Sequence, residues 1–199
     1  MRAVAVRFAL GEGMNLGGGI GLWIRSDLDY DVIRMTSIDR TCEMQAISLN
    51  DKKISIINVY RPIWDMSIFI STLESNILAA KAKYPSNDII MVGDFNVNLQ
   101  KSSCNTDNLL DITMDLGLIQ QVTIPTRVSD NFETLIDHVY TKSKKKIKTD
   151  VITPQISDHY ATLTSFINDK HSRKKTSITK RWFKAESYIE LATLLGATD

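Results

Sequence analysis

The stretch that decides the fold is IIMVGDFNVNL, residues 89–99. Its leading apolar run predicts a short buried β-strand over 88–92, and the Gly-Asp-Phe-Asn that follows is rich in residues that favour turns. Asp94 and Asn96 stand two positions apart, and so on one side of an extended chain. Ligand-binding groups often lie at the carboxyl ends of buried strands. The stretch is therefore typical of either a turn or a functional site.

Around this strand the apolar pattern changes period several times. Helical spacing predicts one helix over 65–83 and a second over 106–116, which ends at Gly117. Asn50-Asp51 between two β-type runs predicts a hairpin turn. Paired strands mixed with two helices indicate an α+β or layered α/β sheet protein. The expected strands cover residues 20–24, 42–49, 53–60, 88–92, 134–141, 147–153 and 160–167.

Composition places the chain among globular proteins. It has 199 residues, of which 43% are hydrophobic and 24% charged, and a formal net charge of +1. Length fits one domain with an appendage. Basic residues gather at 142–148 and at 170–184, a pattern typical of either nucleic-acid contact or a solvated loop. The candidate DNA contacts in the first cluster are Lys144, Lys145 and Lys146.

Cysteine usage and hydropathy indicate the compartment. Cys42 and Cys104 lie far apart without metal-type spacing, which favours a reducing environment. No apolar run approaches the roughly 18 residues that span a membrane. We expect an intracellular protein with no membrane association.

Two further segments place polar residues at strand ends. Tyr60 and Arg61 close the strand over 53–60, and both carry donors suited to phosphate. Asp158 and His159 precede the strand over 160–167 and combine a metal-binding oxygen with a titratable imidazole. Each pair alone is equally typical of an ordinary strand end.

The strand TLIDHVY, residues 134–140, contains an acid between apolar neighbours. Asp137 shares a face with Leu135 and Val139, which favours an inward carboxylate, unless the strand is an edge with Asp137 in solvent. His138 points to the opposite face, and we expect a packed or surface histidine there.

Taken together, these strand-end groups would converge if their strands are neighbours in one sheet. Carboxylates, an amide and a histidine around one site suit a divalent cation such as Mg²⁺, which can activate a phosphoryl group. The set therefore predicts metal-assisted phosphodiester hydrolysis.

In this order and spacing, the segments YRP, GDFN, TLIDHVY and SDH resemble the endonuclease/exonuclease/phosphatase superfamily. The resemblance covers residues 16–167 and is closest to the apurinic-like endonuclease domain of non-LTR (LINE-like) retrotransposons. It implies a four-layered α/β sandwich of two packed mixed β-sheets flanked by helices. It also implies a nuclease that uses Mg²⁺ or Mn²⁺ to nick DNA and leave a 3′-hydroxyl, in the nucleus.

The resemblance assigns catalytic roles to four residues. Asp94 would orient or deprotonate the attacking water, and Asn96 would hold that water and the phosphate. His159 would contact the scissile phosphate, with Asp137 fixing the tautomer of its ring.

Three binding roles follow from the same resemblance. Tyr60 would bind the substrate phosphate, with Arg61 as a second candidate. Asp158 would contribute to the metal environment.

The chain also departs from the family pattern. The family's first strands carry an Asn and then a Glu that is the principal metal ligand, whereas Glu12 and Asn15 stand in the wrong order in a Gly-rich loop. We expect an N-terminally truncated domain over 1–168, missing its first strands, followed at 169–199 by a basic linker and short helix that lead to a reverse transcriptase. The alternative functions are a catalytically dead nucleic-acid-binding or interaction module and, third, a phosphatase of small molecules.

Overall fold

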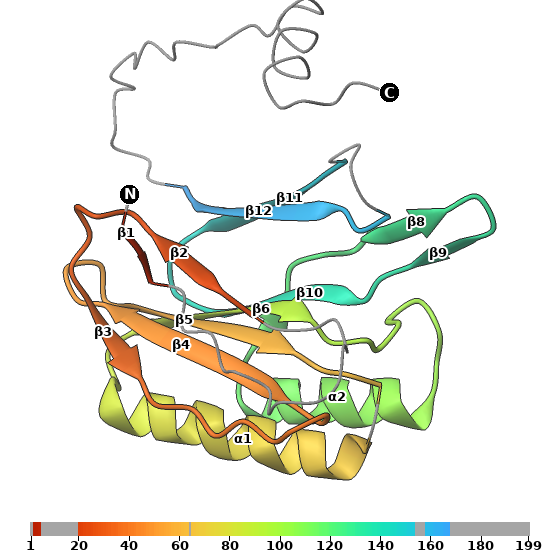
Figure 1. Cartoon of the computed structure of the whole chain (residues 1–199), viewed down its shortest axis with the longest axis horizontal. Helices are drawn as coiled ribbons and strands as arrows, with labels where there is room; N and C mark the ends of the chain where they lie inside the picture. The colour runs from red at the N-terminus through yellow and green to blue at the C-terminus, as the bar shows by residue number, and fades with distance from the viewer. Residues whose placement is uncertain (1, 5–19, 64, 154–157, 168–199) are drawn as a thin grey trace, which may run out of the picture. The chain divides into compact units, whose positions relative to one another are not determined.

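A six-stranded mixed sheet forms the centre of the molecule (Figure 1). The computed structural model describes residues 2–4, 20–63, 65–153 and 158–167. The strand order is β3-β4-β5-β6-β10-β7, and only β5 and β6 run parallel. The strands of this sheet are β3 (Tyr30–Ile33), β4 (Glu43–Leu49), β5 (Ile54–Tyr60), β6 (Asp88–Asp94), β7 (Ile119–Gln120) and β10 (Asp137–Lys142).

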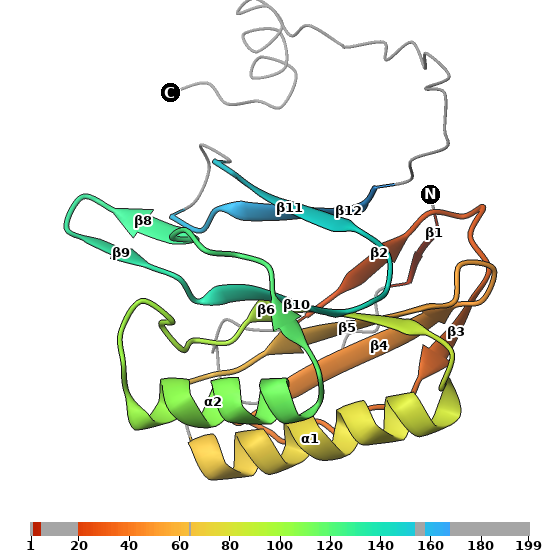
Figure 2. The ribbon, with the colours of Figure 1, turned by 180° about the vertical axis from the view of Figure 1, so that it is seen from behind.

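Two helices, α1 (Met66–Lys83) and α2 (Cys104–Asp115), cover one face of this sheet (Figure 2). Helix α2 begins two residues earlier than the sequence pattern predicted, because the Ser103 hydroxyl caps it by accepting a hydrogen bond from the Thr106 backbone N–H at 3.1 Å. It ends as predicted at Gly117, whose φ of 70° is the left-handed conformation that closes many helices.

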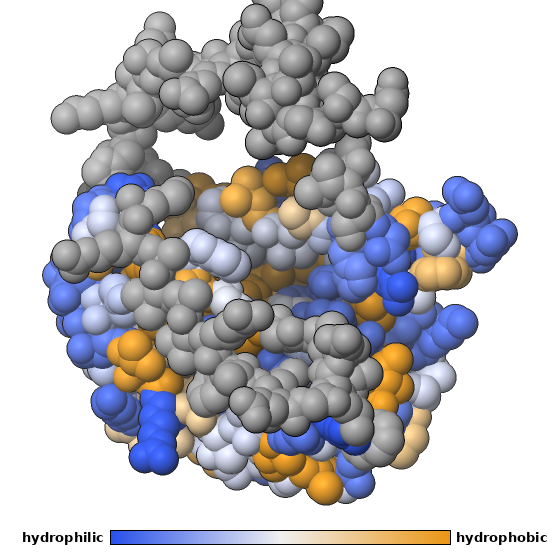
Figure 3. All heavy atoms as spheres, in the orientation of Figure 1, coloured by the Kyte–Doolittle hydropathy of each residue, from blue (hydrophilic) through white to orange (hydrophobic). Residues whose placement is uncertain are grey.

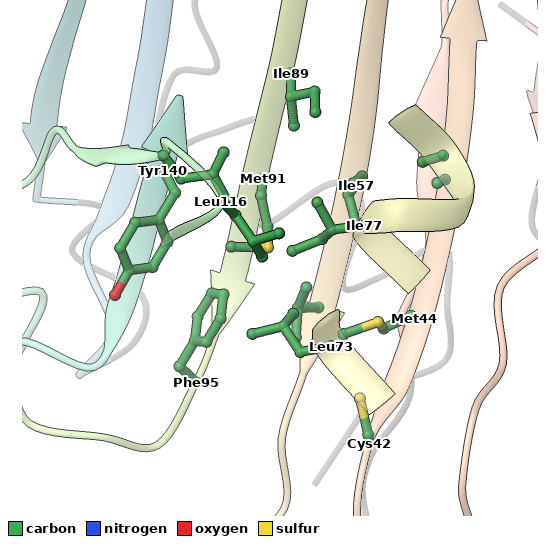
Figure 4. Close-up of a cluster of buried hydrophobic side chains, with 14 of the residues drawn as sticks. Cys42, Met44, Ile57, Leu73, Ile77, Ile89, Met91, Phe95, Leu116 and Tyr140 are labelled. Carbon is green, nitrogen blue, oxygen red and sulfur yellow. The ribbon is translucent and has the colours of Figure 1, made fainter. Parts of the chain in front are cut away.

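The main hydrophobic core lies between the sheet and the two helices (Figure 4). His138 is buried in this layer and stacks on Phe95 at 4.8 Å between ring centroids. Its Nε2 lies 2.9 Å from the Val97 carbonyl oxygen. Of the two expected environments, packed or surface, His138 occupies the packed one. Fully buried side chains of this core include Met44, Ile57, Phe69, Leu73, Ile77, Met91 and Tyr140.

Three two-stranded sheets complete the described fold. Val92, Val139 and Val151 belong to a second apolar cluster, which joins β6 and β10 to β11 on the face away from the helices. Mixed sheets with two helices in layers confirm the expected α/β sandwich class. In the space-filling view, mainly hydrophilic residues cover the projecting β8–β9 hairpin (Figure 3). The pairs are β1 (Arg2–Val4) with β2 (Leu22–Ile24), β8 (Arg127–Ser129) with β9 (Phe132–Thr134), and β11 (Ile147–Ile152) with β12 (Ala161–Phe166).

The stretch at 89–99 forms a strand and a turn in succession. Strand β6 continues through Gly93 to Asp94, two residues beyond the predicted end. A Cβ at Gly93 would lie 1.8 Å from the Val59 carbonyl oxygen, so only glycine fits where β5 and β6 come this close. The chain then turns at Asn96, whose φ is 48°. Asp94 therefore stands at a strand end, and Asn96 lies in a left-handed turn rather than on an extended strand.

The chain divides into two compact units, Met1–Ile167 and Asn168–Asp199. The second unit, the basic segment at 170–184, Glu12 and Asn15 all lie outside the described residues. The domain boundary at residue 168 stays a prediction. Among the described residues, no helix has the length and apolar content to cross a membrane.

Candidate active site

One row of strand-end residues crosses the sheet. Glu43 pairs with Tyr60, Tyr60 with Asp94, and Asp94 with Asp137. Directly paired residues on neighbouring strands point to the same side of a sheet. Because the residues that alternate with them lie in the core under the helices, this strand-end row faces the other side.

The turn after β6 holds the Asp94 carboxylate. The Asn96 backbone N–H donates to Asp94 Oδ1 at 3.0 Å, and the Asn96 amide donates to Asp94 Oδ2 at 3.3 Å. Burial raises the pKa of Asp94 above its usual range, and the nearby charge of Asp137 raises it further, although the Asn96 hydrogen bond opposes this. The raised pKa makes Asp94 a stronger base than an exposed carboxylate.

Asp137 and His159 form a close pair. His159 Nδ1 lies 3.1 Å and 3.0 Å from the two carboxylate oxygens of Asp137. A carboxylate is an acceptor, so Nδ1 carries the hydrogen of this bond, and the contact fixes the tautomer of the ring. The Asp137 backbone N–H donates to Thr126 Oγ1 at 2.9 Å, which fixes the start of β10.

Asp94, Asp137 and His159 together could hold a metal ion. Each offers one ligand atom, and the three atoms lie within 4.8 Å of one another. Mg²⁺ is usually bound by one or two carboxylates, with waters and substrate phosphate oxygens completing its shell. The two aspartates fit this pattern, since His159 Nδ1 is already engaged by Asp137.

Asp158 pairs with Arg127. Its carboxylate accepts a hydrogen bond from Arg127 Nε at 2.7 Å, and this partner lowers the pKa of Asp158. The described group that could hold a metal contains Asp94, Asp137 and His159 but not Asp158. The metal role of Asp158 stays a prediction.

Arg61 departs from the expected phosphate contact. Its side chain is only 2% exposed, and its Nη1 donates to the carbonyl oxygens of Phe95 and Asn96 at 3.3 Å each. Its guanidinium also lies over the ring of Phe69 at 5.5 Å. Arg61 therefore supports the turn that carries Asn96 and offers no surface to a substrate.

The lysine cluster lies at the opposite end of the sheet from the carboxylates. Asp137 begins β10 opposite Asp94, whereas Lys142 ends β10 opposite Ile89. Five steps along the strand at roughly 3.3 Å each separate Asp137 from Lys142 by about 17 Å. The candidate DNA contacts Lys144, Lys145 and Lys146 are therefore separate from the strand-end row.

Sequence reasoning missed two residues of this region. Glu43 begins β4, and the predicted hairpin could have placed it opposite Tyr60; burial raises its pKa. Arg127 is bridged to His159 through its backbone, and its charge reaches Asp94. Nothing in the local pattern around Arg127 signals this position, which depends on pairing with a distant segment.

Comparison with known proteins identifies the family of this chain. Residues 54–163, more than half of the chain, match a family described as endonuclease-reverse transcriptase. The chain belongs to this family, which confirms the resemblance drawn from its motifs. No curated protein matches the chain.

Solved structures of related fold were also found. The endonuclease domain of TRAS1, a telomere-specific non-LTR retrotransposon, is 14% identical, with 69% of this chain and 78% of that chain covered and a TM-score of 0.49. Truncated Caenorhabditis elegans TDP2 is 14% identical, with coverages of 70% and 66% and a TM-score of 0.49. An endonuclease/exonuclease/phosphatase family protein from Leptotrichia buccalis is 16% identical, with coverages of 72% and 73% and a TM-score of 0.46.

Proposed function

We propose that this protein is a metal-dependent DNA endonuclease that nicks one strand and leaves a 3′-hydroxyl. The observation that carries the proposal is the convergence of Asp94, Asp137 and His159, whose ligand atoms lie within 4.8 Å of one another, on a chain of the endonuclease-reverse transcriptase family. The family description pairs the nuclease with a reverse transcriptase, for which the 3′-hydroxyl would serve as a primer. Such a protein would act in the nucleus.

Asp94 is the base in this proposal. The hydrogen bonds from Asn96 hold the carboxylate in one orientation, in which it can orient the attacking water and accept its proton. The water oxygen then bonds to phosphorus, and the bond from phosphorus to the 3′-oxygen breaks. Asn96 acts here as a positioning residue, since its amide donates to Asp94 and to the Arg61 carbonyl oxygen at 2.8 Å.

His159 contacts the scissile phosphate through Nε2. Asp137 holds Nδ1 and thereby fixes both the tautomer and the orientation of the ring. The pair resembles the arrangement by which a carboxylate orients a catalytic histidine in other hydrolases.

Tyr60 and Arg127 supply further phosphate contacts. The pKa of Tyr60 is raised by burial, by Asp94 and by Glu43, so its hydroxyl remains protonated and can donate to a phosphate oxygen. Arg127 has five N–H donors and a side chain 38% exposed; among the described residues only its Nε donates, to Asp158. We therefore assign to Arg127 the cationic contact with the substrate phosphate that the sequence pattern predicted for Arg61, which is buried.

Asp94 and Asp137 would hold the metal, which we propose to be Mg²⁺ with Mn²⁺ as its substitute. The bound ion would polarise a phosphoryl oxygen and stabilise the departing 3′-oxygen. Oxygen ligands from two carboxylates suit both ions.

Nicking of supercoiled plasmid tests the proposal. The chain is incubated with Mg²⁺ or with chelator, beside variants Asp94→Asn and His159→Ala. We expect Mg²⁺-dependent nicks in the unaltered chain alone, and extension of the nicked end by a DNA polymerase, which requires a 3′-hydroxyl. Plasmid that stays supercoiled while DNA is retained with a steep salt dependence would instead support the non-catalytic binding module.

A further inference from the structure

A lysine-lined groove lies at the end of the sheet opposite the strand-end row. Its volume is about 830 Å³, and four segments form its walls: the β4–β5 turn, the end of α1 with the turn that follows, the chain after α2, and the turn after β10. We call it the lysine groove. Its basic residues are Lys52, Lys53, Lys81, Lys142, Lys144 and Lys145.

Positive charge is concentrated in the lysine groove. Six lysines face two acids, Asp51 and Asp88, which gives the groove a formal charge of +4, whereas the whole chain has a formal charge of +1. Lys145 Nζ pairs with Asp88 at 2.7 Å, so one acid is already neutralised. A concave surface of one sign focuses its field and attracts ligands of the opposite charge.

Two of these lysines are held in place rather than solvated at random. The ammonium groups of Lys81 and Lys142 both donate to the Leu116 carbonyl oxygen, at 3.2 Å and 3.1 Å. Leu116 closes helix α2, and helix carboxyl ends favour cations. The two ammonium groups therefore stand close together at a cost in repulsion, in agreement with a pKa of Lys81 lowered by burial and by Lys142.

The two ammonium groups held at the Leu116 carbonyl oxygen, with four further lysines lining the same groove, match a ligand that carries several negative charges along a chain. A helix end carries only about half a unit of negative charge, so the lysine pair keeps a positive excess. An anion between the two would relieve their repulsion. Phosphates in a nucleic-acid strand repeat at intervals that let neighbouring lysines each contact one.

We propose that the lysine groove binds the phosphate backbone of DNA, at a second site about 17 Å from the strand-end row. The choice of DNA as the occupant rests on the proposed function. No residue of the candidate active site lines the groove. The groove can therefore hold DNA whether or not the chain cleaves it.

Salt dependence of DNA binding tests this site. A fluorescent duplex of roughly 30 base pairs, about 100 Å long, is titrated with the full chain in chelator, which separates binding from cleavage. The slope of log affinity against log salt is measured by fluorescence anisotropy. We expect the variant Lys81→Gln/Lys142→Gln and the variant Lys144→Gln/Lys145→Gln each to lower the slope by about 0.9 for every phosphate that the variant no longer neutralises.

Two further variants make the test more specific: one removes a negative charge from the groove, and one should leave DNA binding unchanged. Asp88→Asn removes an acid from the groove, so it should tighten binding, whereas Lys148→Gln alters a lysine already paired with Asp150 in β11 and should change nothing. If Lys81→Gln/Lys142→Gln does not fold, as circular dichroism would show, Lys144→Gln/Lys145→Gln and Asp88→Asn still test the proposal. Wild-type slopes in the folded groove variants, or displacement of DNA by a poly-glutamate peptide of equal charge, would overturn the proposal.

Discussion

Asp94 and Asp137 stand directly opposite each other on β6 and β10, as one registered pair of an antiparallel ladder. Like charges in direct opposition destabilise a sheet, and burial adds to the cost. The arrangement therefore lowers stability where the proposed chemistry needs two carboxylates, a trade-off typical of functional sites.

Replacing Asp94 by Asn should separate stability from activity. The folded-state pKa of Asp94 is raised above its unfolded value, so the folded chain binds its proton more tightly and loses stability as pH rises through that range. At neutral pH, Asp94→Asn removes this cost while keeping one acceptor for Asn96. We expect an equal or higher melting temperature, with nicking abolished. A clearly lower melting temperature would contradict the inference that the charged Asp94 carboxylate reduces stability.

Asp137→Asn tests the orientation of the imidazole. The amide can present a donor to Nδ1 of His159 and so favour the wrong tautomer. We expect the nicking rate constant to fall by about 10²–10⁴-fold, with the DNA dissociation constant little changed. Nitrogen NMR shifts of His159 should report the change of tautomer. An unchanged tautomer in an inactive variant would exclude this role.

Replacing Arg61 by Met should mainly lower stability, whereas replacing Arg127 by Met should mainly weaken DNA binding. Arg61→Met leaves the Phe95 and Asn96 carbonyl oxygens without their charged donor, and we expect the free energy of unfolding to fall by about 2–4 kcal/mol. Arg127→Met should cost less than about 1 kcal/mol, because its ion pair is half exposed.

For DNA binding we expect the larger effect from Arg127→Met and the smaller one from Arg61→Met. The salt slope should fall by about 0.9 for Arg127→Met, which can no longer neutralise its phosphate, and stay unchanged for folded Arg61→Met. Urea titration and anisotropy measure the two quantities. A reduced slope for Arg61→Met alone would restore the role that the sequence pattern assigned to it.

His138 should make stability depend on pH. Burial lowers its folded-state pKa to about 4, below the unfolded value of about 6.5. Between these values the unfolded chain binds the additional proton, so stability falls as pH decreases through this window. We expect a loss of up to about 3 kcal/mol between pH 7 and pH 4, measured by urea unfolding. His138→Gln should flatten this part of the profile; an identical slope would assign it to other groups.

Local patterns in the sequence predicted the elements that carry the site, because apolar spacing and turn residues act over short distances. The strand before Asp94, the hairpin at Asn50-Asp51 and both helices follow from such patterns. Helix α2 begins two residues earlier than predicted because Ser103 caps it, so that Cys104 is its first residue.

What local patterns missed depended on contacts between distant segments. The pairing of Asp94 with Asp137 links residues far apart in the chain. Arg61 is buried because the turn at Phe95 and Asn96 leaves carbonyl oxygens that need a donor. The sequence did contain a sign that the lysine cluster is separate from the carboxylates, since the lysines follow the end of the predicted strand over 134–141 and Asp137 lies within it.

A comparison of the two ends of β6 tests the proposed nuclease most directly. Asp94 and Asp88 are the last and first residues of this strand. The single-turnover nicking rate is measured at saturating plasmid and Mg²⁺ for the unaltered chain, Asp94→Asn and Asp88→Asn. We expect a measurable rate for the unaltered chain, a rate within about two-fold of it for Asp88→Asn, and a loss of at least about 10²-fold for Asp94→Asn. Equal rates for the two variants, or no Mg²⁺-dependent nicking in the unaltered chain, would contradict the assignment of catalysis to the strand-end row.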